Sequence, residues 1–215
     1  MKIGILGTGQ VGATLGTKLL QLGHEVKMGS RSAHNEKALA WVNSNGAHAS
    51  NGTFSDAASF GEILLNCTSG QGSLEALSLA DAANMEGKIL IDVSNPLDFS
   101  KGMPPTMSIC NTDSLGEQIQ RTYPNVKVVK TLNTLNCILM TKPESLGAGD
   151  HDLFMSGNDA GAKAVVRELL SSFGWKNIHD LGDISTSRGT EQWLPLWIRL
   201  MGSLGTVHFN LKIVK

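Results

Sequence analysis

The sequence predicts an α/β protein with a doubly wound, mainly parallel sheet and a C-terminal helical segment. Three observations predict this fold. An apolar run at residues 2–6 leads directly into a glycine-rich stretch and then into a helical pattern. Short apolar runs then alternate with helical patterns along most of the chain, as in a parallel sheet covered on both faces. From residue 182 this alternation stops. The first of these observations is characteristic of a Rossmann-type fold.

The chain of 215 residues is long enough for one α/β domain with a small appendage. We therefore expect residues 1–181 to form one Rossmann-type domain. Residues 182–215 would form a C-terminal helical segment that covers the active site, contributes to a dimer interface, or does both.

The glycine-rich stretch is typical of a dinucleotide-binding turn. It follows the first expected strand and begins the first expected helix, which is the context that this motif requires. The first glycine makes the tight turn, the second lets a pyrophosphate approach the backbone, and the third lets the helix pack closely on the strand. The helix N-terminus then favours an anion. An ordinary βα turn without a ligand is the alternative. The predicted cofactor-binding residues are Gly7, Thr8, Gly9, Gln10, Val11 and Gly12.

The residues after the second expected strand, 25–28, favour NADP over NAD. NAD enzymes usually place an acidic residue here to bind the ribose. This chain has Ser30, Arg31 and Ser32 instead. An arginine can pair with a 2′-phosphate through two parallel hydrogen bonds and stack on adenine, whereas a carboxylate would repel the phosphate. We predict that these three residues bind NADP, with Lys37 as a possible further cation. A solvated surface arginine is the alternative.

The remaining elements continue the alternation. Further strands are expected at residues 47–50, 62–67, 88–93, 125–130, 152–157 and 176–181. Helices are expected at residues 11–22, 34–45, 54–60, 73–85, 114–121 and 160–173, with Thr53 as the N-cap of the third. Residues 97–112 lack periodicity and are rich in Pro, Gly, Ser and Met. We expect a long surface loop there, and such loops often have a function.

Polar residues follow two of these strands at their carboxyl ends, where open α/β sheets bind ligands. Thr68 and Ser69 follow the strand at 62–67, and we expect them to lie along the cofactor, although a helix-capping loop would use the same residues. Asn133 and Thr134 follow the strand at 125–130. Their uncharged hydrogen-bonding groups suit a nicotinamide carboxamide or a neutral ring edge.

The C-terminal segment carries two tryptophans, Trp193 and Trp197, at helical spacing with other large apolar residues. Pro195 stands near the first turn of that helix, where proline is tolerated. The tryptophans belong either to the core or a dimer interface, or they contact a flat aromatic ligand.

Composition excludes several classes of function. The net charge is −1, which argues against a nucleic-acid or anionic-membrane partner. No stretch has the length and apolarity of a membrane span, and the first strand leaves no room for a signal peptide. The six histidines are scattered singly, so no metal site is expected. The cysteines, Cys67, Cys110 and Cys137, are odd in number and widely spaced, which indicates thiols in a reducing cytoplasm.

The chain resembles the coenzyme F420:NADP oxidoreductase family, a domain that also occurs at the cytoplasmic end of the Steap metalloreductases. The resemblance rests on GTGQVG at the N-terminus, GSRS after the second strand, SNP after the fifth, KTLNTL after the sixth, and SRGTEQWLPLW near the C-terminus. It implies that the glycine turn, Ser30 and Arg31 hold NADP, and that the nicotinamide lies near Asn95, Pro96 and Asn133. A deazaflavin (F420) or flavin (FMN or FAD) ring would then stack on the exposed nicotinamide face.

This resemblance implies an oxidoreductase that transfers hydride between NADPH and a flavin-like acceptor, as a cytoplasmic homodimer. The chain has no Ser-Tyr-Lys or His-Asp set for protonating a carbonyl. Hydride transfer between two flat rings requires mainly that the rings are held in contact without water. A pyrroline-carboxylate or imine reductase-like enzyme is the nearest alternative, but its C-terminal helical domain is longer. A 6-phosphogluconate-type dehydrogenase would need still more chain, and a non-catalytic NADP-sensing module is the third alternative.

Overall fold

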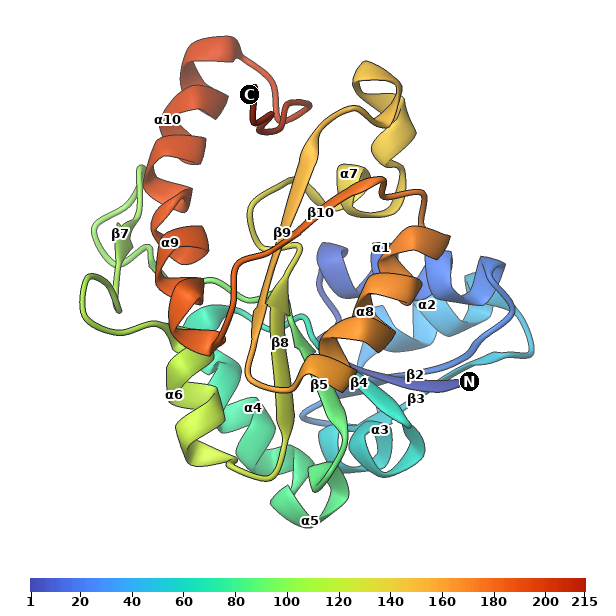
Figure 1. Ribbon diagram of the computed structural model, residues 1–215. Coiled ribbons are helices and arrows are strands. Elements are labelled where there is room, and N and C mark those ends of the chain that lie inside the picture. Colours follow the sequence, from blue (N-terminus) through green and yellow to red (C-terminus); the bar gives the residue numbers. More distant parts are fainter.

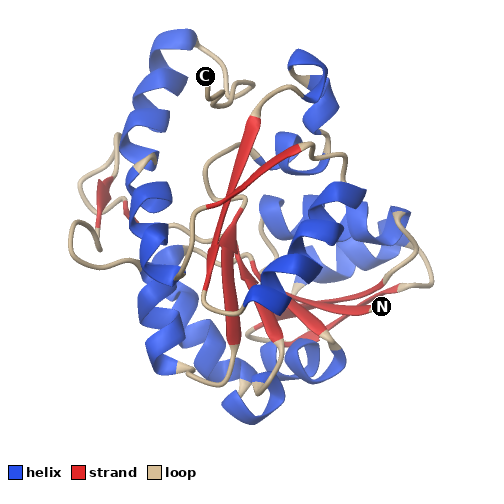
Figure 2. Ribbon diagram, in the orientation of Figure 1, coloured by secondary structure: helices blue, strands red, loops and turns tan.

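The structure is a computed structural model that describes residues 1–215. Its centre is one sheet of eight strands in the order β10-β9-β8-β5-β4-β1-β2-β3, with helices on both sides (Figures 1 and 2). The strands are β1 (Lys2–Leu6), β2 (Glu25–Ser30), β3 (Ala49–Thr53), β4 (Ile63–Asn66), β5 (Ile89–Asp92), β8 (Lys127–Thr131), β9 (Asp152–Gly157) and β10 (Asn177–Asp180). The expected doubly wound sheet is confirmed.

The strands from β3 to β8 in the sheet are all parallel, whereas β9 pairs with β8 in the antiparallel direction and β10 runs with β9. The sheet is therefore mainly parallel, with two reversed strands at one edge. After β1 the chain builds β2 and β3 on one side, and then crosses to β4 on the other side of β1. This change of direction leaves a crevice at the carboxyl ends of β1 and β4, the usual ligand position in such sheets.

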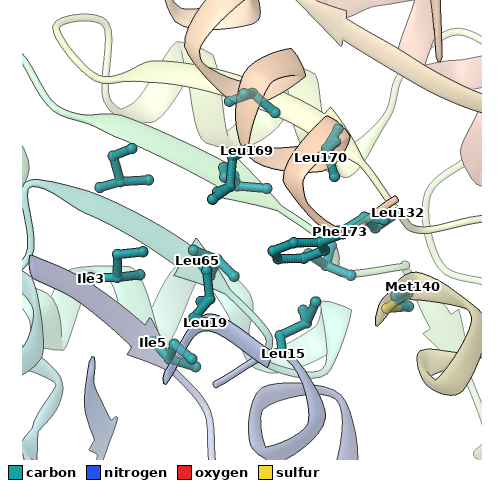
Figure 3. Close-up of a cluster of buried hydrophobic side chains, with 14 of the residues drawn as sticks. Ile3, Ile5, Leu15, Leu19, Leu65, Leu132, Met140, Leu169, Leu170 and Phe173 are labelled. Carbon is teal, nitrogen blue, oxygen red and sulfur yellow. The ribbon is translucent and has the colours of Figure 1, made fainter. Parts of the chain in front are cut away.

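Two hydrophobic cores, one on each face, hold the helices to the sheet. The helices are α1 (Gln10–Gln21), α2 (Glu36–Asn45), α3 (Phe54–Phe60), α4 (Ser73–Ala80), α5 (Ala82–Met85), α6 (Leu115–Thr122), α7 (Cys137–Thr141), α8 (Ala160–Ser172), α9 (Ser187–Gln192) and α10 (Leu194–Leu204). Residues from α1, α2, α7 and α8 form the larger core, part of which is drawn in Figure 3. Residues from α3, α4, α5 and α6 form the other.

The larger core follows directly from the apolar patterns of the sequence. Ile3 and Ile5 of β1 and Leu15 and Leu19 of α1 are fully buried and point toward one another (Figure 3). Burying one such side chain contributes about 1.5–3 kcal/mol to folding. Because β1 and α1 pack through these residues, the glycine turn between them has a defined conformation.

Several local expectations were inaccurate. The third strand is β3, which begins two residues later than expected and extends to Thr53; this residue caps α3 through a capping box with Asp56. The helix expected at 73–85 is broken into α4 and α5 at Asp81, whose φ is 71°. The expected loop at 97–112 contains a short ribbon of β6 (Leu97–Asp98) and β7 (Thr106–Met107). Helix α7 was not predicted, because its five residues are too few for a periodic pattern.

The C-terminal segment begins with a turn of 3₁₀ helix and continues as α9 and α10, of which α9 packs beside β9 (Figure 1). After α10 the chain turns back toward the start of β9. The amide of Asp152 donates to the carbonyl of Leu211, and the Asn210 side chain donates to the carbonyl of Asp152. The Trp197 and Phe209 rings stack at 5.2 Å between centroids. No helix of the structure is long and apolar enough to span a membrane.

Candidate active site

The crevice at the carboxyl ends of β1 and β4 holds two cavities that adjoin the glycine turn. The larger, of about 570 Å³, is bounded by Gly7, Thr8, Gly9 and the end of β2. The smaller, of about 230 Å³, is bounded by Gln10 and Val11 at the start of α1. We name them the adenosine cavity and the nicotinamide cavity, after the two ends of a dinucleotide that such an arrangement would take.

Each glycine of the turn has the surroundings that its predicted role requires. Gly7 has φ of 120°, and a Cβ there would lie 2.7 Å from the carbonyl oxygen of Cys67. A Cβ on Gly12 would lie 2.4 Å from the Gly7 carbonyl oxygen, so this glycine lets α1 pack against the turn. At Gly9, by contrast, a Cβ would meet no atom within 4 Å. Gly9 therefore faces open space, which fits a pyrophosphate lying against the backbone.

Arg31 lies exposed in the lining of the adenosine cavity, at the end of β2. Its guanidinium takes part in no salt bridge within the chain. The turn that presents it is shaped by Ser30, whose hydroxyl donates to the carbonyl of Ser32 at 2.6 Å. The Ser32 hydroxyl accepts from the amide of His34. The arginine is thus free to pair with a phosphate, while both serine hydroxyls are engaged in forming the turn. Lys37 does not line the cavity.

The opposite wall of the adenosine cavity contains Thr68 and Ser69. Ser69 is exposed, whereas the Thr68 hydroxyl donates to the side chain of Asn66 at 2.7 Å. Sequence reasoning missed seven further lining residues, which are Asn35, Phe54, Cys67, Gly72, Glu75, Ala76 and Leu79. The position of Phe54 could have been predicted from the sequence, because this residue directly follows a strand whose carboxyl end faces the same crevice. Leu79 is 48% exposed.

The nicotinamide cavity is formed by neutral side chains. Asn95 follows β5 and Asn133 follows β8, and their side chains hold each other: Asn95 Nδ2 donates to the Asn133 carbonyl at 2.8 Å, and Asn133 Nδ2 donates to Asn95 Oδ1 at 3.0 Å. Leu194 and Trp197 of α10 close the cavity from the C-terminal segment. The full lining is Gln10, Val11, Val93, Asn95, Asn133, Leu135, Asn136, Cys137, Met140, Leu194 and Trp197.

Two of the residues predicted to surround the nicotinamide do not line this cavity. Pro96 is buried next to Asn95. Thr134 lines a separate apolar cavity of about 210 Å³ beside Phe154 and Trp193. The Thr134 hydroxyl and the Trp193 indole nitrogen are buried without a hydrogen-bond partner. The two tryptophans of the C-terminal segment thus line different cavities, with Trp197 in the nicotinamide cavity.

A buried ionic network lies beneath the nicotinamide cavity, and sequence reasoning did not find it. The side chain of Lys130, at the end of β8, is fully buried. Its Nζ lies 2.8 Å from Asp92 Oδ2 and 2.8 Å from Glu191 Oε1, and it donates to the Ser94 carbonyl at 2.6 Å. Desolvation alone would lower the pKa of Lys130, but the two carboxylates raise it above its ordinary value. The lysine is therefore charged. A lysine within an otherwise apolar strand pattern was the only available signal.

Of the three cysteines, Cys67 has a thiol whose reactivity is lowered by its surroundings. Desolvation, reinforced by the Asp92 carboxylate, raises the pKa of the Cys67 thiol, which keeps the thiol protonated and unreactive at neutral pH. All three cysteines are free. No group of three or more histidine, cysteine or acidic side chains is arranged to hold a metal ion.

Comparison with known proteins identifies several relatives of this chain. Residues 2–96 match the model of a family described as NADP oxidoreductase, coenzyme F420-dependent. A crystal structure of a protein from Arthrobacter sp. FB24, named as an F420-dependent NADP reductase, is 52% identical with a TM-score of 0.95, and the match covers 100% of both chains.

Two curated relatives are more distant. An F420-dependent NADP reductase of Methanocaldococcus jannaschii is 28% identical, over 93% of this chain and 92% of the relative. The metalloreductase STEAP3 of Rattus norvegicus is 29% identical over 91% of this chain, which spans only 38% of the length of that relative. An imine reductase from Myxococcus stipitatus shares the fold at 17% identity, with a TM-score of 0.64 over 95% of this chain and 63% of that one.

Proposed function

Since this chain belongs to the coenzyme F420-dependent NADP oxidoreductase family and is an NADP-dependent oxidoreductase, we propose that it transfers hydride between NADPH and the deazaflavin F420. The names of its relatives support F420 as the acceptor or donor. We further propose that Arg31 binds the 2′-phosphate, that the glycine turn holds the pyrophosphate, and that Asn95 and Asn133 orient the nicotinamide.

The observation that carries the proposal is the neutrality of the nicotinamide cavity. Its polar side chains are amides, and its only titratable group is the buried Cys137 thiol. Reduction of a carbonyl or an imine generally needs a positioned proton donor. Hydride transfer between two planar rings depends instead on contact and orientation, which the cofactor chemistry allows with little help from protein acids or bases. The cavity is therefore better suited to a ring-to-ring transfer than to imine reduction.

In this proposal the protein acts by positioning. The amides of Asn95 and Asn133 bind a carboxamide edge, and the apolar faces of Leu194 and Trp197 exclude water from the ring. NADPH supplies the hydride when bound. In this proposal the C-terminal segment, 182–215, completes a site whose floor belongs to residues 1–181.

FMN, FAD and ferric chelates are the second group of acceptors that we propose to test, because the STEAP3 relative is named a metalloreductase. We also propose a homodimer. Leu196 and Leu204 on α10 are 52% and 56% exposed, which favours contact with a second copy of this chain. A cytoplasmic location stays a prediction based on the cysteine pattern.

The test is an acceptor screen. NADPH oxidation is measured with F420, FMN, FAD, a ferric chelate and a cyclic imine, and each reaction is repeated with NADH. We expect turnover with F420 and NADPH and far slower turnover with NADH. If the cyclic imine were the only acceptor that is reduced, the imine reductase alternative would replace this proposal. Tight NADPH binding without oxidation by any acceptor would indicate the sensing module instead.

A further inference from the structure

The buried Lys130 joins three segments that are distant in sequence. Its ammonium contacts Asp92 at the end of β5, the carbonyl of Ser94 in the following turn, and Glu191 on α9. Glu191 also accepts hydrogen bonds from the amides of Leu115 and Gly116, at the N-terminus of α6, at 2.8 and 3.0 Å. All three charged side chains are at most 2% exposed. The ammonium and both carboxylates therefore have partners.

These contacts connect both walls of the nicotinamide cavity. Ser94 precedes Asn95, so the bond from Lys130 to the Ser94 carbonyl positions the turn that carries this amide. Asn95 in turn holds Asn133. On the other side, Glu191 lies three residues before Leu194, which begins α10 and lines the cavity. Lys130 thus links the turn that carries Asn95 to the helix that leads to the apolar wall of the cavity.

The same polar network extends toward the adenosine cavity. Asp92 Oδ1 accepts from Asn66 Nδ2 at 2.9 Å, and Asn66 Oδ1 accepts from the Thr68 hydroxyl at 2.7 Å. Thr68 lines the adenosine cavity. The loops after β4 and β5 are therefore linked through Asn66 and Asp92, which line neither cavity.

We propose that Lys130 and Glu191 are positioning residues for hydride transfer: their ion pair sets the separation between the Asn95–Asn133 floor and the Leu194–Trp197 wall. This inference rests on the proposed function. A displacement of about 1 Å between reacting groups can reduce a rate about a hundredfold, so a small change in this separation is sufficient to slow the reaction.

A second ion pair provides a matched control. It joins α9 to α6, the two helices that Glu191 also connects, but it does not touch the cavity. Arg188 of α9 pairs with Glu117 of α6, which also bonds to Ser114. Glu117 therefore connects α6 to α9 as Glu191 does, but it makes no contact with Lys130. If these acidic residues only stabilised the packing of α9, removing either charge would have the same effect on catalysis.

The experiment compares Glu191→Gln with Glu117→Gln in the full-length chain. Each substitution removes the negative charge and keeps the shape of the side chain. For Glu191→Gln we expect kcat with F420 to fall about tenfold to a hundredfold. The dissociation constant for NADPH should change less than about twofold, because the adenosine cavity is intact. The deuterium isotope effect with 4-deuterated NADPH should rise as hydride transfer becomes rate-limiting. Glu117→Gln should keep the wild-type kcat and isotope effect.

One further measurement and one further variant give a decision in every case. The fluorescence of bound NADPH reports the surroundings of the nicotinamide without any acceptor, and we expect it to change in Glu191→Gln alone. If Glu191→Gln does not fold, Glu191→Asp serves instead, with a smaller change in the same direction. Equal kcat, isotope effect and NADPH fluorescence in the two variants would overturn the inference. Failure of wild-type turnover with an altered NADPH fluorescence in Glu191→Gln would count against the proposed acceptor and not against the positioning role.

Discussion

The two halves of the proposed cofactor site are built in opposite ways. The adenosine half consists of backbone and an exposed cation: Gly7, Gly9 and Gly12 shape the turn, and Arg31 extends into solvent. The nicotinamide half consists of side chains from distant segments, held in place by the buried Lys130 and Glu191. The first half is contiguous in sequence, whereas the second is assembled only when β5, β8 and α9 meet.

This difference predicts how each half responds to substitution. A solvent-exposed group can be removed at little cost to folding, because water replaces its contacts. A buried charge cannot be removed alone, because the partners left behind have no access to water. Substitutions in the adenosine half should therefore affect mainly binding. Those in the nicotinamide half should affect both folding and catalysis.

The largest expected effect is that of Lys130→Met on stability. Removing the lysine leaves Asp92 and Glu191 buried without their cation. We expect the free energy of unfolding to fall by about 3–5 kcal/mol, measured by urea denaturation at neutral pH. The wild-type pKa of Lys130 is raised, so its contribution is complete below the ordinary lysine pKa and is lost only as the pH rises through the raised value. A loss below about 1 kcal/mol would show that the network contributes little to folding.

The next effect is that of Arg31→Ala on cofactor selection. We expect NADPH binding to weaken by about 1.5–3 kcal/mol, the cost of losing a hydrogen bond to a charged group, with no change in thermal stability. NADH binding should be nearly unaffected. Calorimetric titration with both cofactors measures this, and Lys37→Ala is the control because Lys37 lies outside the cavity. Equal weakening of NADPH and NADH would contradict the assignment of the 2′-phosphate.

A third effect separates two glycines of the same turn. Gly9→Ala places a methyl group in open space, so we expect unchanged stability but binding of NADP(H) weakened by about 1.4 kcal/mol or more, a tenfold loss. Gly12→Ala places its methyl group 2.4 Å from a carbonyl oxygen, and we expect a loss of about 1–3 kcal/mol in stability. Thermal unfolding and cofactor titration of both variants provide the check. Similar stability losses in the two would count against an open pyrophosphate site at Gly9.

The smallest effect concerns the partly exposed Glu117–Arg188 pair. The hydrogen bond from Arg188 lowers the pKa of Glu117, although desolvation opposes it. A carboxyl with a lowered folded pKa contributes stability above its ordinary value, near 4.3, and loses it as the pH falls through the folded value. Glu117→Gln should therefore be less stable at pH 7 by under about 1 kcal/mol, and this difference should disappear in acid. Urea denaturation at both pH values tests it, and an unchanged difference in acid would exclude this explanation.

The two halves also differ in how well the sequence predicted them. Gly7, Thr8 and Gly9 were expected together with Arg31, Thr68 and Ser69, and all six line the adenosine cavity. Asn95 and Asn133 were expected near each other and hold each other directly. Thr134 was expected beside them but lines a different cavity, because the chain leaves β8 through Leu132, whose φ is 61°, and successive residues then face different sides.

By itself, the sequence determined the sheet, the helix that follows β1 and the cofactor-binding turn, because apolar periodicity and glycine positions act over a few neighbouring residues. Only the tertiary structure decided that Lys130 pairs with Glu191 and that Trp197, but not Trp193, lines the nicotinamide cavity. A buried charge is stable only beside its partner, and that partner lies 61 residues along the chain. No local sequence pattern specifies a contact between residues so far apart in the chain. Only the packing of α9 beside β8 brings these two side chains together.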